Sequence, residues 1–142
     1  MITRFSRVVF LGMVLVLGFI QVCNAQEKSQ QKAVEAAQKW LALIDQGEYG
    51  ESWETASDYF RGAVAEKQWQ QALTAVRSPL GKVITRKLKS KQYAASLPGA
   101  PDEEYMVIQF EPSFEKKKSS IETITPMKEK DGSWRVSGYY IK

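Results

Sequence analysis

The stretch W-L-A-L-I-D-Q-G-E-Y-G-E-S-W, Trp40 to Trp53, decides how the chain begins to fold. Gly47 and Gly50 interrupt its helical spacing of apolar residues, and glycine is the residue that most often follows a helix end. We therefore predict that one amphipathic helix ends at this corner and that a second begins beyond it and packs back on the first. Asp45 falls in the last turn, where we expect its carboxylate to accept hydrogen bonds from backbone N–H groups around Gly47.

The helical pattern extends to both sides of this corner. Apolar residues at Val34, Ala37, Leu41 and Ile44 recur every three or four positions, which predicts a first helix with Ser29 as its N-cap. A short second helix is predicted around Trp53, and a third from about residue 64 to 76. The prolines all lie at or beyond residue 79, so the helices are confined to the front of the domain.

The second half of the chain changes to the two-residue period of strands. Strands are predicted over residues 82–93, 105–110, 121–127 and 134–141, with the Asp131-Gly132 pair as a hairpin turn. Pro112 should end regular pairing or mark an edge. Trp134 and Val136 are predicted to share a face with Tyr140. Helices followed by antiparallel strands, without alternation, indicate the α+β class: two or three N-terminal helices packed on a four-stranded antiparallel sheet.

The N-terminus has the pattern of a secretory signal peptide. Arg4 and Arg7 precede an apolar run over residues 8–22, and Cys23-Asn24-Ala25 offers small residues for cleavage between Ala25 and Gln26. The run is shorter than the roughly 20 residues of a membrane span. We therefore expect a signal peptide over residues 1–25, a single domain over residues 26–142 without a membrane span, and a periplasmic or secreted location. Lipidation of Cys23 is the alternative, although the bulky Val22 stands where lipoproteins have a small residue.

Composition excludes several chemistries. The chain has no histidine, and its single cysteine would leave with the signal peptide, which excludes Ser-His-Asp and Cys-His nucleophiles and the usual zinc sites. No phosphate-binding loop is present, so nucleotide cofactors have no support. The acidic run Asp102-Glu103-Glu104 lacks the alternate spacing and the glycine turn of a metal-binding loop. We therefore expect neither a cofactor nor a metal. Removing Arg4 and Arg7 leaves 18 basic against 16 acidic residues, a balance that gives no case for a nucleic-acid partner.

Basic side chains gather in one segment without an acidic residue. They are Arg77, Lys82, Arg86, Lys87, Lys89 and Lys91. Such a segment is suited to an anionic partner. It is equally typical of an edge strand whose lysines prevent strands of different molecules from pairing.

Three blocks of the sequence resemble a known family. Ala36 to Trp53, Ser78 to Leu88 and Asp131 to Ile141 resemble, in this order, the exported bacterial family called domain of unknown function 4019. The family has no established activity. It is similar in turn to the nuclear-transport-factor-2-like or cystatin-like architecture, which implies a curved, cone-like sheet covered by helices. The corner also resembles the helical hairpin of tetratricopeptide repeats, but no second copy follows it.

The cone-like architecture implies a place for a pocket. Some proteins of this architecture use a carboxylate and tyrosines there for proton transfer, and the corresponding candidates are Asp45, Tyr49, Asp58, Tyr59 and Tyr105. One expectation is therefore a small cofactor-free lyase or isomerase that uses Asp45 or Asp58 with a tyrosine.

We favour a different expectation, a non-catalytic module that binds a protein or a small apolar or anionic ligand, with a homodimer through the open sheet face as one arrangement. The four tryptophans fall on the apolar sides of the predicted elements and should form the core. On that basis Trp53→Ala should cost roughly 3 to 5 kcal/mol of stability.

Overall fold

The computed structural model describes the backbone of residues 8–142 and the side chains of residues 22–142. The chain divides into two compact units, residues 1–31 and 32–142, and each is described by itself. The first unit is helical from Val8 and belongs to helix α1 (Val8–Gln46), while part of the predicted signal peptide, residues 1–7, lies outside the described residues. No helix within the described residues combines the length and the apolar character needed to cross a membrane.

Four α-helices precede the sheet in the described residues. After α1 come α2 (Tyr49–Glu54), α3 (Asp58–Ala63) and α4 (Glu66–Arg77), and a 3-10 turn follows at Ser78–Leu80. The prediction of a helix start at Ser29 was wrong: α1 runs through this residue, because residues 26–31 are ordinary helix formers without a glycine or proline. The predicted second helix is divided in two, since the Ser57 hydroxyl accepts a hydrogen bond from the Phe60 N–H at 3.1 Å and so caps a new helix.

The corner between α1 and α2 is confirmed. Gly47 has a φ of 79°, and its N–H donates to the Ile44 carbonyl at 3.1 Å. The Glu48 N–H donates to the Leu43 carbonyl at 2.9 Å. These two bonds are those of a helix end closed by a glycine in the left-handed conformation.

Gly47→Ala is expected to destabilise the protein by about 1 kcal/mol, because an L side chain is strained at this φ although it meets no atom within 4 Å. Gly62→Ala is the matched control: Gly62 lies inside α3 with an equally open environment and no positive φ. Alanine should stabilise there by roughly 0.5 to 1 kcal/mol. Urea unfolding of the two variants measures both values, and equal signs of the two changes would contradict the conformational argument.

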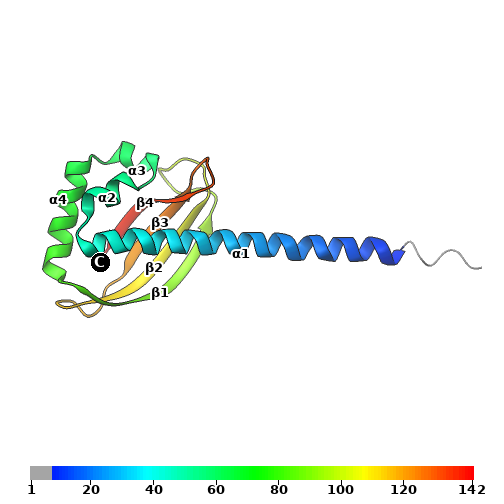
Figure 1. Ribbon diagram of the computed structural model, residues 1–142, viewed down its shortest axis with the longest axis horizontal. Coiled ribbons are helices and arrows are strands. Elements are labelled where there is room, and N and C mark those ends of the chain that lie inside the picture. Colours follow the sequence, from blue (N-terminus) through cyan, green and yellow to red (C-terminus); the bar gives the residue numbers. More distant parts are fainter. Residues whose placement is uncertain (1–7) are drawn as a thin grey trace, which may run out of the picture. The chain divides into compact units, whose positions relative to one another are not determined.

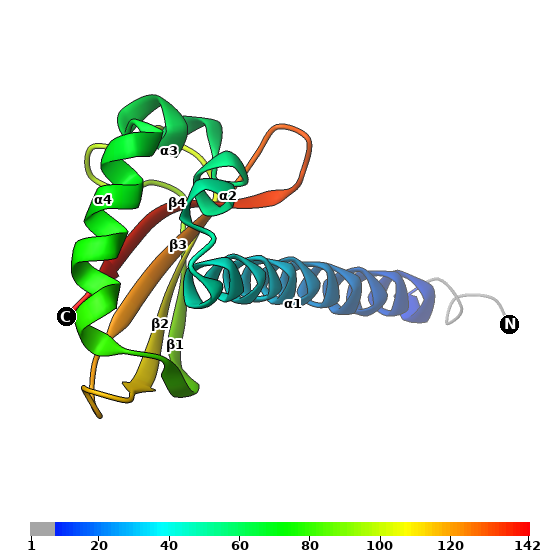
Figure 2. The same cartoon turned by 60° about the vertical axis from the view of Figure 1, so that its left-hand side comes forward.

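The four strands form one antiparallel meander, as the α+β prediction requires (Figures 1 and 2). The strands are β1 (Val83–Ala94), β2 (Tyr105–Phe114), β3 (Glu122–Lys128) and β4 (Trp134–Ile141), in the order β1-β2-β3-β4. Pro112 lies inside β2 and faces Arg86 of β1, but the pairing of β2 with β3 stops at Phe110. The pairing of β2 with β3 thus ends before the proline, as predicted, while the pairing of β2 with β1 continues past it.

A bulge in β4 corrects the predicted face of one tyrosine. Thr125 pairs with Gly138 and Pro126 with Val136, so Ser137 is an extra residue in β4. An extra residue exchanges the two faces beyond it. Tyr139 therefore joins the core side, whereas Tyr140, predicted to lie there, is 62% exposed.

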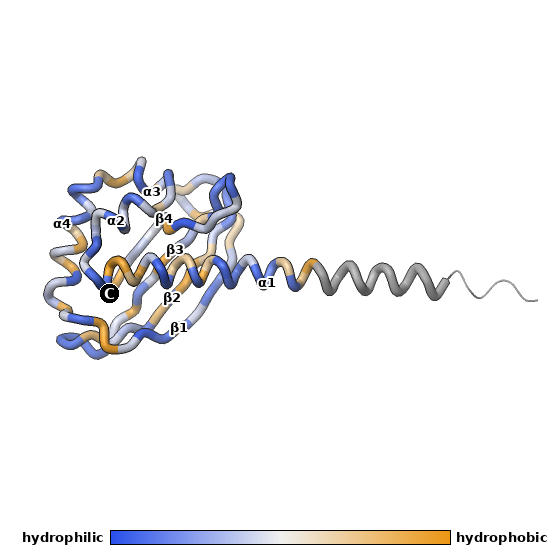
Figure 3. Tube along the Cα trace, in the orientation of Figure 1, coloured by the Kyte–Doolittle hydropathy of each residue, from blue (hydrophilic) through white to orange (hydrophobic). Residues whose placement is uncertain are grey.

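One hydrophobic core joins the helices to one face of the sheet. Along the described part of α1, hydrophobic and hydrophilic residues alternate (Figure 3). The hydrophobic set of α1 packs with inward-facing residues of β2, β3 and β4, among them Ile108, Ile124 and Val136. Trp40, Trp69 and Trp134 are buried, as predicted, while Trp53 is only partly buried and packs against the core. The remaining open space therefore lies at the margins of the core.

Candidate functional site

The five tyrosine and carboxylate candidates do not gather in one cavity, and only Asp58 and Tyr59 line a hollow together. Tyr105 is 1% exposed and its hydroxyl donates to the Pro101 carbonyl at 2.7 Å. The Tyr59 hydroxyl donates to the Gly99 carbonyl at 2.8 Å, and Tyr49 packs against the core. The carboxylate of Asp58 is 76% exposed and pairs with Arg61. The hydroxyls of Tyr59 and Tyr105 thus bond carbonyls of the loop, and neither is paired with a carboxylate. Proton transfer would use a tyrosine–carboxylate pair.

Asp45 lies in a different place, in a cluster of ion pairs. Arg86 donates to both of its oxygens, at 2.6 and 2.9 Å, and Arg77 donates to one of them at 2.7 Å. The prediction that Asp45 bonds the backbone around Gly47 was therefore wrong. The two guanidinium groups come from α4 and β1, and they satisfy the carboxylate at the helix end better than the turn does.

Glu122 holds the other side of this cluster. It is 0% exposed and accepts hydrogen bonds from Arg86 Nε and from the Tyr139 hydroxyl, each at 2.7 Å. Arg77 Nη1 lies 3.8 Å from its Oε1, and the guanidinium of Arg77 stands 5.0 Å from the centre of the Phe114 ring. We name Asp45, Arg77, Arg86, Glu122 and Tyr139 the ion-pair cluster. It ties together the ends of α1 and α4 and three strands of the sheet.

Asp45 stays ionised and Tyr139 stays protonated at neutral pH. Burial alone would raise the pKa of Asp45, but the hydrogen bonds from Arg86 and Arg77 outweigh it and hold that pKa below its usual 3.8. These pairs therefore stabilise the fold above pH 3.8 and are lost as the pH falls further. Burial and the adjacent charge of Glu122 raise the pKa of Tyr139, so its hydroxyl remains a donor. Neither group is suited to exchange protons near pH 7.

The predicted basic segment is divided between this cluster and the surface. Arg77 is 5% exposed and Arg86 has a side chain 14% exposed, so neither belongs to a surface patch. The lysines of the segment remain exposed, three of them in β1 and one directly before it. β1 is an edge strand of the sheet, as one of the two interpretations predicted. They are Lys82, Lys87, Lys89 and Lys91. The helical spacing of Arg77 behind Trp69 and Leu73 is a signal in the sequence that this arginine faces the core.

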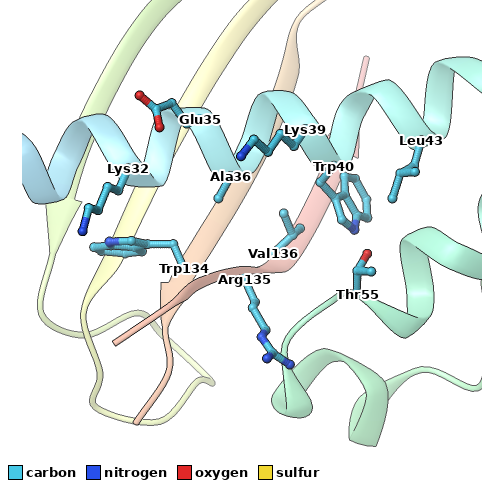
Figure 4. Close-up of a pocket in the computed structure, with 10 residues that line it drawn as sticks. All are labelled: Lys32, Glu35, Ala36, Lys39, Trp40, Leu43, Thr55, Trp134, Arg135 and Val136. Carbon is cyan, nitrogen blue, oxygen red and sulfur yellow. The ribbon is translucent and has the colours of Figure 1, made fainter. Parts of the chain in front are cut away.

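A hollow of the domain lies between α1 and β4 (Figure 4). We call it the α1/β4 groove; its volume is about 490 Å³. Its walls include the apolar side chains of Ala36, Trp40, Leu43, Trp134 and Val136. Polar and charged side chains complete the lining, namely Lys32, Glu35, Lys39, Thr55 and Arg135. The volume falls in the range of small-molecule sites.

Charge in the α1/β4 groove is predominantly positive. Lys32 and Lys39 have no ion-pair partner among the described residues, and Arg135 lies 3.8 Å from Asp131. In Figure 4 the amine of Lys32 lies beside the ring of Trp134. Sequence reasoning missed this groove, because its two walls come from segments about a hundred residues apart.

A second hollow, of about 420 Å³, lies near the start of α3 and the β3–β4 turn. Asp58 and Tyr59 line it together with residues of both charges, including Lys128, Glu129 and Arg135. Its mixed charge gives no preference for one class of ligand. The described residues contain no cluster of three side chains of the metal-binding types.

The family assignment rests on most of the domain. Among curated proteins, none matches the sequence. The family model described as "Protein of unknown function (DUF4019)" matches residues 36–139. This range contains the α1–α2 corner, the ion-pair cluster, strands β1 to β3, most of β4 and most of the α1/β4 groove. The arrangement is compatible with the nuclear-transport-factor-2-like architecture. The chain therefore belongs to the DUF4019 family of proteins of unknown function.

Proposed function

We propose that the protein is an exported, non-catalytic binding module and that the α1/β4 groove is its ligand site. The observation that carries the proposal is the combination of an apolar wall with cations at its margin, of which Lys32 and Lys39 have no ion-pair partner among the described residues. A site of this kind binds an amphipathic anion, since the apolar part of the ligand covers Trp40 and Trp134 while its charged end meets Lys32, Lys39 or Arg135.

The choice of a binding role is supported by the chemistry of the side chains. The chain has no histidine, and Asp45 and Glu122 are committed to arginine pairs. In the α1/β4 groove the one carboxylate is Glu35, and no tyrosine lines it. Selective binding needs only the shape and the charge of the groove, and both are present. Export is supported by Arg4, Arg7 and the apolar run that follows them.

The outer face of the sheet gives a dimer little support. Its central side chains are polar: Gln109 Nε2 donates to the Thr123 hydroxyl at 3.5 Å, and the Ser137 hydroxyl donates to the Thr125 carbonyl at 2.8 Å. Stable homodimer interfaces are more apolar than this. The proposed function is therefore that of a monomeric domain.

Three probes with one alkyl chain and different head groups test the proposal: decanoate, decanol and decyltrimethylammonium. We expect decanoate to bind most tightly and the cation least, and we expect its NMR shift changes to centre on Trp134, Val136 and Lys39. Lys39→Glu should weaken decanoate about tenfold, because an attraction becomes a repulsion. Titration followed by NMR and calorimetry measures both effects.

The matched control is Lys67→Glu, since Lys67 is exposed on α4 and lines neither hollow. It should leave the affinity for decanoate unchanged. Equal binding of all three probes, or equal losses for Lys39→Glu and Lys67→Glu, would show that the α1/β4 groove does not select anions and would refute the proposed function.

A further inference from the structure

The free edge of β1 has features beyond those of the α1/β4 groove. The strand contains twelve residues and pairs only with β2 in the described part of the chain. Nine of its twelve residues are exposed and the other three are partly buried. An edge of this length presents a row of backbone N–H and C=O groups that another extended segment can pair with.

The side chains at this edge are partly apolar. Ile84, Leu88 and Tyr93 are exposed by 62%, 48% and 41%. Leu88 pairs with Phe110 and Tyr93 with Met106, so both lie on the core side of the sheet, next to the edge. Side chains of a strand added beside β1 would cover them, which gives such a strand apolar contacts as well as backbone hydrogen bonds.

The charge of the edge selects the partner. Lys82, Lys87, Lys89 and Lys91 are exposed, and no acidic residue occurs between residues 82 and 94. Of these four lysines, only Lys89 has an ion-pair partner among the described residues, Glu111 at 2.9 Å. A second copy of β1 would place lysines beside lysines, which is unfavourable across neighbouring strands. An acidic segment would instead meet complementary charges.

Irregularities in the pairing define where such a segment fits. The register between β1 and β2 shifts at Ile84 and again at Lys89, which leaves Ser90–Ala94 as the longest regular run of β1. Bulges of this kind protect an edge against indiscriminate pairing. They restrict a partner to a short segment over this run, close to Lys89, Lys91 and Tyr93.

We propose that the free edge of β1 is a docking site for a short, extended, acidic segment of another protein, which adds to the sheet as a fifth strand beside Ser90–Ala94. Lys91 pairs with Ile108 and Tyr93 with Met106, so both face the core side of the sheet. On that side an acidic side chain of the segment meets Lys91 and an apolar one covers Tyr93, while a further acidic side chain meets Lys89. This site is separate from the α1/β4 groove, because none of these residues lines that groove.

The probe is an eight-residue peptide in which two glutamates alternate with two valines, so that each face of the strand presents both residue types. It is blocked at both ends. It should bind the full-length protein and slow hydrogen exchange at the outward amides of Ser90–Ala94. The double variant Lys89→Glu/Lys91→Glu should weaken this binding by at least about tenfold. Lys67→Glu, also on the surface, should not change it, and neither should Lys39→Glu in the α1/β4 groove. Circular dichroism verifies that each variant is folded.

Two further peptides separate strand addition from simple charge attraction. The same glutamate–valine peptide with N-methyl groups at alternate residues, on the amides that face the edge, keeps its charge but cannot pair, and should lose binding. A lysine–valine peptide should not bind at all. Equal binding of the N-methylated peptide, an equal effect of Lys67→Glu, or unchanged exchange in β1 would each overturn the proposal. A failure of decanoate binding would leave it intact, since the two sites share no residue.

Discussion

Glu122→Ala is expected to destabilise the folded protein by about 3 to 5 kcal/mol. Glu122 is 0% exposed and lies between Arg86 and the hydroxyl of Tyr139, each bonded to it at 2.7 Å. Its removal leaves Arg77 and Arg86 with Asp45 as their only acidic partner, so one buried positive charge loses its compensation. The cost arises chiefly from that uncompensated charge and only secondarily from the lost contacts. Urea unfolding measures it as a lower midpoint.

Two matched variants define the origin of this loss. Glu111→Ala removes an exposed partner of Lys89, whose side chain is 44% exposed, and should cost less than about 1 kcal/mol. Glu122→Gln retains an acceptor for Arg86 but not the charge. Its loss of stability should lie between those of Glu111→Ala and Glu122→Ala. If Glu122→Ala costs no more than Glu111→Ala, the ion-pair cluster does not stabilise the fold in the way that its burial indicates.

The ion-pair cluster also shows what the sequence does not reveal. The four strands were predicted to within a few residues, because a period of two and the turn residues are local signals that pairing preserves. The end of α1 at Gly47 is equally local. By contrast, Asp45 meets Arg86 across 41 residues and Arg86 meets Glu122 across 36. No spacing rule links such pairs, so the partners of Asp45 were predicted wrongly.

The same distinction applies to the candidate site. The bulge at Ser137 determines that Tyr139 and not Tyr140 faces the core. Gly138 follows it and Pro126 lies on the paired strand, and both residue types are common at bulges. This signal appears only when the two strands are aligned. The α1/β4 groove is formed by two elements at opposite ends of the domain. Its lining includes residues such as Lys32 and Lys39, for which the sequence pattern predicts a solvent-exposed helix face. Only their place in the lining of the α1/β4 groove makes them candidates for binding an anion.

Trp69→Ala is expected to cost about 3 to 5 kcal/mol, the second largest effect. Trp69 is 8% exposed and lies at the centre of the aromatic cluster: its ring centre is 4.9 Å from that of Phe60, 5.8 Å from that of Trp40 and 6.1 Å from that of Tyr139. Its Nε1 also donates to the Ser52 hydroxyl at 3.0 Å. The substitution therefore opens a cavity where α2, α3 and α4 meet, and removes aromatic contacts of about 0.5 to 1.5 kcal/mol each.

Trp53→Ala is the matched comparison, and the structure lowers the value expected for it. Trp53 is partly buried at the margin of the core, and its Nε1 donates to the Val64 carbonyl at 2.7 Å. With less area to lose from the interior, its replacement should cost about 2 kcal/mol instead of the 3 to 5 kcal/mol of a fully buried tryptophan. Unfolding in urea followed by far-ultraviolet circular dichroism compares the two without relying on tryptophan emission. A larger loss for Trp53→Ala than for Trp69→Ala would place the centre of the core between α1 and α2 instead of beneath α4.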